Sequence, residues 1–116
     1  GATAVNLDSG SGGVNCSTDF NLTSVATKIT MNGGAATDFI GRATLIAGTV
    51  TVLNTNIAAG DRIFVTRSAL NGTPACGHLL TTINAGVSFV IAAYTNAGAA
   101  AVTDVSTVDY FIVRQT

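Results

Sequence analysis

From residue 39 to the C-terminus, short runs of β-branched and aromatic residues are separated by clusters of Gly, Asn and Pro. We interpret these runs as strands, at residues 44–53, 62–67, 78–83, 88–95 and 106–114. Turn-forming residues lie between them at 54–60, 71–74 and 84–86, and an Ala- and Gly-rich loop spans 96–101. Five or six short strands with turns between them predict an all-β fold, an antiparallel β-sandwich of jelly-roll-like type.

Two of these runs are apolar on both faces, because hydrophobic residues occupy odd and even positions alike. A strand of a monomeric sandwich usually keeps one polar face toward water. The second face is therefore expected to meet another layer or another subunit, and a cyclic homo-oligomer is the usual arrangement. The candidate residues for the core or the oligomer interface are Phe89, Ile91, Val108, Tyr110 and Ile112.

Residues 1–38 differ from the rest, being rich in Gly, Ser, Asn and Thr. We interpret them as an extended N-terminal arm or anchor, followed by a β-sandwich domain at 39–116. Met31 is the single methionine, which favours a processed product or a fragment of a longer protein. Cys16 and Cys76 are too far apart for a zinc or redox motif, so they are either two free thiols or one disulfide.

Charged residues make up only 9% of the chain, and the formal net charge is -1. An average soluble protein has about 25% charged residues. Because the cations are few and scattered, a nucleic-acid-binding surface is not expected. No apolar run reaches about 18 residues, so insertion into a membrane is not expected either.

The residue types that carry out catalysis are nearly absent. The sequence has one histidine, His78, and no glutamate. Asp61, Asp104 and Asp109 have no acidic neighbours, and we expect Asp61 to close a turn by local hydrogen bonding. We therefore predict no catalytic residues, no cofactor and no metal, although one Asp per subunit could still hold a metal on a symmetry axis.

The segment from Phe39 to Val113 resembles a known family of phage proteins. It contains Gly-Thr-Val-Thr-Val at 48–52, Asp-Arg-Ile-Phe-Val-Thr-Arg at 61–67 and Val-Ser-Thr-Val-Asp-Tyr-Phe-Ile-Val at 105–113. Their order and spacing resemble the β-rich C-terminal domains of tailed-phage virion proteins: head fibres, capsid decoration proteins and tail fibre tips. The resemblance implies a non-catalytic homotrimer that is located in the virion and contacts other capsid or tail proteins.

Three functions follow from these observations. The first is a head fibre or capsid decoration subunit that projects from the virion or stabilises it. The second is a receptor- or carbohydrate-binding domain at a fibre tip, which would hold a host-surface glycan through Tyr94, Tyr110 and Arg67, although the absence of Trp makes sugar stacking less favourable. The third is a pilin-like or adhesin subunit in which residues 1–31 donate a strand to a neighbour.

Overall fold

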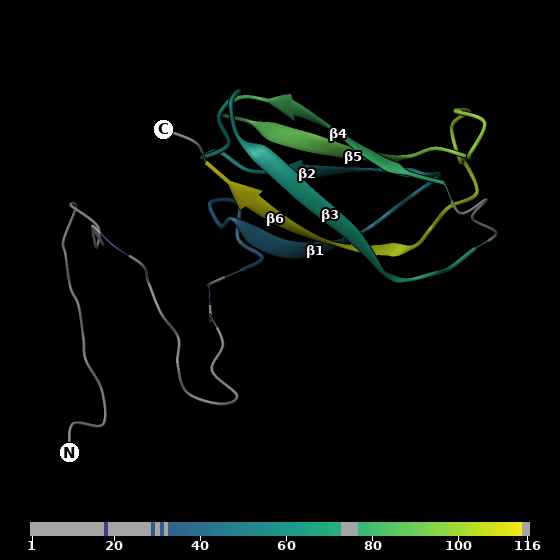
Figure 1. The fold of residues 1–116 in the computed structure, drawn as a ribbon, viewed down its shortest axis with the longest axis horizontal. Coiled ribbons are helices and arrows are strands. Elements are labelled where there is room, and N and C mark those ends of the chain that lie inside the picture. Colours follow the sequence, from purple (N-terminus) through teal and green to yellow (C-terminus); the bar gives the residue numbers. More distant parts are fainter. Residues whose placement is uncertain (1–17, 19–28, 30, 32, 73–76, 115–116) are drawn as a thin grey trace, which may run out of the picture. The chain divides into compact units, whose positions relative to one another are not determined.

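The computed structural model describes residues 18, 29, 31, 33–72 and 77–114, and the second compact unit of the chain, Met31–Thr116, contains a two-layer β-sandwich (Figure 1). One layer, called sheet A here, has the strand order β1-β6-β3, and the other, sheet B, has the order β2-β5-β4. All pairings in both sheets are antiparallel. The prediction of an all-β antiparallel sandwich is confirmed. The strands are β1 Ile40–Thr44, β2 Thr49–Leu53, β3 Arg62–Ala69, β4 Leu79–Asn84, β5 Ser88–Ala93 and β6 Thr107–Val113.

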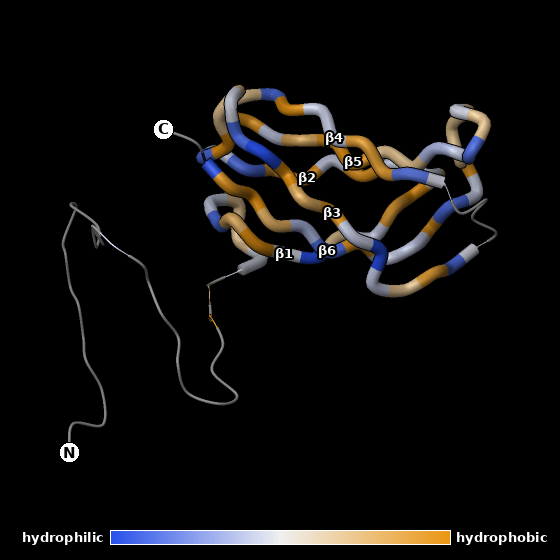
Figure 2. Tube along the Cα trace, in the orientation of Figure 1, coloured by the Kyte–Doolittle hydropathy of each residue, from blue (hydrophilic) through white to orange (hydrophobic). Residues whose placement is uncertain are grey.

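The core lies between the two central strands, β5 and β6. Their side chains alternate, and the inward set is buried (Figure 2 shows β5 as hydrophobic along most of its length). Phe89 and Tyr110 meet edge to face with ring centroids 5.1 Å apart, a favourable arrangement for two aromatic rings. The structure places all five candidate core or interface residues in this core: Phe89, Ile91, Val108, Tyr110 and Ile112.

The segment just before β1 is hydrogen bonded to the sandwich. The buried Asn54 donates from Nδ2 to the Asp38 carbonyl (2.7 Å), and Thr55 N donates to the Ala36 carbonyl (2.9 Å). Gly34 N donates to the carbonyl of Ile40, at the start of β1 (3.1 Å). Residues 33–38 are thus held to the start of β1 and to the loop after β2, while most of the predicted arm, including Cys16, falls outside the described residues, as does Cys76.

The prediction of one strand over residues 44–53 is wrong. A two-residue turn divides it, with Ile46 N donating to Thr49 O (2.8 Å) and Thr49 N donating back to Ile46 O (3.1 Å). Ala47 and Gly48, between them, have φ values of 51° and 82°. Such a turn reverses the chain, and because β1 and β2 pair with different partners it carries the chain from sheet A to sheet B.

Candidate functional site

Two of the three predicted glycan contacts are not available at the surface. Tyr110 is buried in the core, and Arg67 forms a nearly buried ion pair with Asp104. Arg67 Nη2 lies 2.7 Å from Asp104 Oδ2, and the two side chains are 16% and 0% exposed. This part of the glycan hypothesis is therefore wrong, because Tyr110 is buried and the guanidinium of Arg67 is bound to Asp104 and to the Gly77 carbonyl.

The environment of Asp104 keeps it ionised. Burial raises the pKa of its carboxyl, but hydrogen bonds from Ser106 and Arg67 outweigh that effect and bring the pKa below its ordinary value. Ser106 N donates to Asp104 Oδ1 (2.9 Å), and Arg67 Nη1 donates to the Gly77 carbonyl (2.9 Å). This ion pair therefore holds the loop before β6 and the start of β4 to strand β3.

Asp61 is held by a second ion pair. As predicted, it closes a local turn, with Ala58 N donating to Oδ2 (2.8 Å). The sequence did not indicate its other partner, Arg114, whose Nε and Nη2 lie 2.8 and 2.9 Å from the two carboxylate oxygens. Hydrogen bonds from Arg114 and from the Ala58 amide lower the pKa of Asp61 to about 2. The pair ties the end of β6 to the loop between β2 and β3.

Tyr94 and His78 stack on each other just outside β5 and β4. Their ring centroids are 5.7 Å apart and the rings are inclined by 15°. His78 is exposed and Tyr94 is half-buried. Of the two aromatic residues among the predicted glycan contacts, Tyr94 is partly exposed and Tyr110 is buried.

The outer face of sheet A carries a shallow, open groove of about 690 Å³, a volume within the range of small-molecule sites. Its floor is a row of apolar side chains in register across the three strands: Ile40 on β1, Phe111 on β6 and Phe64 on β3. Gly33 and Gly34 lie along one side of it. Phe64 is 60% exposed and Phe111 39% exposed, which is unusual for such large apolar side chains.

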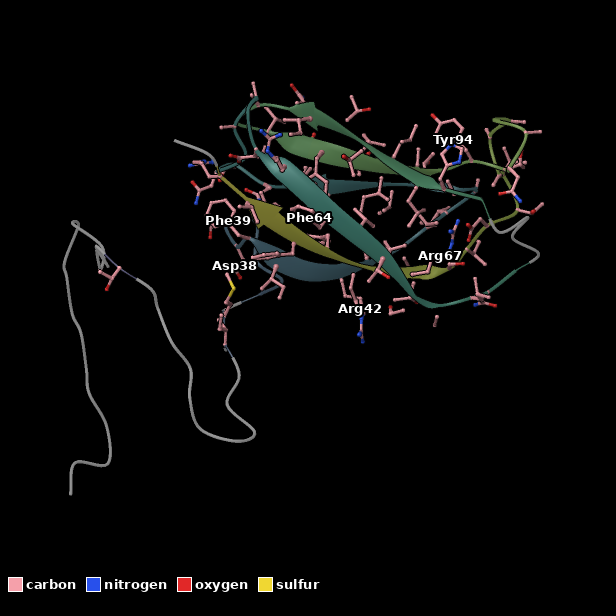
Figure 3. All side chains as sticks on the ribbon, in the orientation of Figure 1. Asp38, Phe39, Arg42, Phe64, Arg67 and Tyr94 are labelled. Carbon is pink, nitrogen blue, oxygen red and sulfur yellow. The ribbon has the colours of Figure 1, made fainter. Side chains whose placement is uncertain are left out.

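A polar row lies beside this apolar row, two residues away from it on each strand. It consists of Arg42 on β1, Asp109 on β6 and Thr66 on β3, also in register. Arg42 Nε and Nη2 donate to the two oxygens of Asp109 at 2.6 and 3.2 Å, and the Arg42 side chain projects away from the ribbon (Figure 3). The hydrogen bond from Arg42 is the main reason that the pKa of Asp109 is lowered. The groove therefore combines an aromatic floor with a polar edge, which is formed by the ionised Arg42–Asp109 pair.

The outer face of sheet B is different in kind. Among the described residues, its side chains are aliphatic, hydroxyl-bearing or, at Asn84, an amide, and none is charged. They are Thr49, Thr51, Leu53, Leu80, Thr82, Asn84, Ser88, Val90 and Ala92.

No group of three or more potential metal-ligating side chains occurs in the part of the chain that the structure describes. Within that same part, no helix is long and apolar enough to cross a membrane.

One comparison with known proteins finds a match. A family model, described as the C-terminal domain of K1 capsule-specific polysaccharide lyase, matches residues 7–113. The chain belongs to this family. No curated protein and no solved structure matches it. Membership of the K1-lyase C-terminal family supports the predicted phage virion context in its general form, without assigning the chain to a head fibre.

The sequence did not predict the groove, although it indicated that Phe64 faces outward. In residues 62–67, Phe64 alternates with Ile63 and Val65, so it belongs on the face opposite to them. That it lies beside Phe111 and Ile40 follows only from the pairing of β3 and β1 with β6.

Proposed function

We propose that this domain is a non-catalytic structural part of a tail-spike-type phage virion protein and that it assembles as a homotrimer. Its family is named for the C-terminal domain of a polysaccharide lyase, which favours the tail spike over the head fibre or capsid decoration subunit of the sequence-based prediction. Its partners are two further copies of the chain and the neighbouring proteins of the virion. The polymer that such a particle meets is a capsular polysaccharide.

The uncharged outer face of sheet B is the observation that carries the assembly proposal. Leu53 and Leu80 are 65% and 53% exposed there, on the two edge strands of the sheet. Complete burial of a leucine stabilises by about 1.5–3 kcal/mol relative to exposure, and threonine hydroxyls can pair across a contact without leaving a buried charge. A face of this kind meets the requirements of a contact between copies.

The state of the carboxylates supports a non-catalytic role. Asp61, Asp104 and Asp109 are each ion-paired with an arginine, and the pKa of each is lowered. A carboxyl group that acts as a general acid needs the opposite, a raised pKa. These three groups hold loops and strands together.

The assembly proposal is tested by placing a charge on the proposed contact. Leu80→Asp should reduce the solution mass from three chains to one, because each contact would bury an unpaired carboxylate. The side chain is more than half exposed, so the isolated fold should tolerate the change. The measurement is light scattering coupled to size exclusion, with circular dichroism to confirm the β-sheet signal.

Leu70→Asp is the matched control, since Leu70 is 62% exposed but directly follows β3, an edge strand of sheet A. Its mass should equal that of the unmodified chain. An unchanged trimeric mass for Leu80→Asp would show that sheet B is not the contact.

A further inference from the structure

We propose that the groove on the outer face of sheet A is a binding site for a pyranose unit of a polysaccharide chain. Phe64 and Phe111 would form the stacking platform, and Arg42 with Asp109 would hold the hydroxyl groups. This inference rests on the proposed function, because a spike domain is placed where it meets capsular polysaccharide. It adds a ligand class and a site to a domain proposed to be structural.

The aromatic floor of the groove offers a surface on which a sugar ring can stack. Phe111 and Phe64 lie directly opposite each other on neighbouring strands, which run about 4.8 Å apart. Their side chains point to the same face of the sheet and line the same groove, and Ile40 extends this apolar row onto β1. The C–H face of a pyranose ring is apolar and flat, so it packs on such a surface and removes the exposed aromatic area from water.

The polar row beside the floor offers hydrogen-bond partners for the hydroxyl groups of the sugar. Arg42 and Asp109 lie two residues along their strands from the platform, a distance of about 6.6 Å. A sugar ring on the platform therefore presents its edge hydroxyls to them. Asp109 is an ionised acceptor with a 37% exposed side chain, and the bidentate contact leaves guanidinium donors of Arg42 that Asp109 does not use. Because the two side chains already fix each other, little conformational entropy is lost when a sugar binds.

The same features make a second copy of the chain a poor occupant of this groove. A protein contact would bury the Arg42–Asp109 pair, and taking an ion pair out of water costs more than its attraction returns unless every polar atom is satisfied. A sugar satisfies those atoms with hydroxyl groups and leaves the pair partly hydrated. Gly33 and Gly34 bring no side chain to the rim of the groove.

The test is binding of the full chain to a panel of immobilised bacterial capsular polysaccharides that includes the K1 type, followed by biolayer interferometry. The unmodified chain should bind at least one of them. Phe64→Ala should weaken that binding by about tenfold or more, as the loss of an aromatic anchor does at a binding hot spot. Arg42→Gln, at a side chain that is 68% exposed, should weaken it several-fold while leaving the fold intact.

Ile46→Ala is the matched control, because Ile46 is 74% exposed in the turn before β2, outside the groove. It should bind as the unmodified chain does.

Failure of the unmodified chain to bind any polysaccharide, or equal binding by Phe64→Ala, would overturn the site. A fall in solution mass caused by Phe64→Ala would also overturn it, since the groove would then be a contact between copies. A trimer that binds no sugar would leave the proposed assembly standing, whereas a monomer that binds sugar through Phe64 would refute the assembly alone.

Discussion

Tyr110 can lie across the core because the residue opposite to it on β1 is Gly41. A Cβ built on Gly41 would overlap the hydroxyl end of the Tyr110 ring. The phenol thus occupies the space that any other side chain at position 41 would need. Burial raises the pKa of the Tyr110 hydroxyl, so the group stays neutral in this position.

Gly41→Ala should therefore destabilise the fold by about 2 kcal/mol, the usual cost of forcing an extra methyl group into a packed core. Urea unfolding at one fixed protein concentration measures this loss. Gly60→Ala is the control glycine, since a Cβ there meets nothing within 4 Å, and it should leave the free energy of unfolding unchanged or slightly raised. Equal stability of the two variants would contradict the packing described for Tyr110.

At the scale of elements, the sandwich depends on short connections that move the chain between sheets. The tightest is the turn at Ala47 and Gly48, where both residues have positive φ. Gly48 accepts this conformation readily, and a Cβ there would collide with the Ala101 carbonyl. Ala47 adopts the same region at a cost, because a left-handed conformation is unfavourable for residues with a Cβ.

Ala47→Asn should therefore stabilise the domain, by about 0.5–1 kcal/mol, since Asn-Gly is the preferred pair in turns with two positive φ values. The midpoint of thermal unfolding should rise accordingly. Ala59→Asn, at an exposed loop position without a positive φ, is the control and should show no rise. A lower midpoint for Ala47→Asn would contradict the turn geometry.

The central strands were predictable from the sequence, whereas β1 was not. In β5 and β6 the alternation separated the two faces and marked Phe89 and Tyr110 as core or interface residues, but both faces are apolar, so the burial of this set follows only from the packing of the two sheets. β1 contains Gly41 and Arg42 and has weak β-propensity of its own, so its formation depends on pairing with β6. The turn within residues 44–53 was missed because Gly48 alone marks it.

The candidate site was less predictable for the same reason. The groove needs Ile40, Phe111 and Phe64 in one row, and these residues are brought together by pairings between strands that are distant in sequence. The predicted contacts Tyr110 and Arg67 failed because alternation places both on the inward side of their strands, where a core residue and a buried ion pair are required.

At the scale of the whole molecule, the two outer faces differ in chemistry. The face of sheet A combines an aromatic platform with an exposed ion pair, while the described face of sheet B carries no charge. Within the described part of the chain, the few charged residues lie in loops or on the strands of sheet A. This division supports the two proposals, assembly through the face of sheet B and ligand binding on the face of sheet A.

The solution mass of the unmodified chain, measured by light scattering at low and at high salt, tests the central claim of assembly most directly. We predict the mass of three chains at both salt concentrations, because an apolar contact without charges is not screened by ions. The mass of a single chain at both concentrations would contradict it.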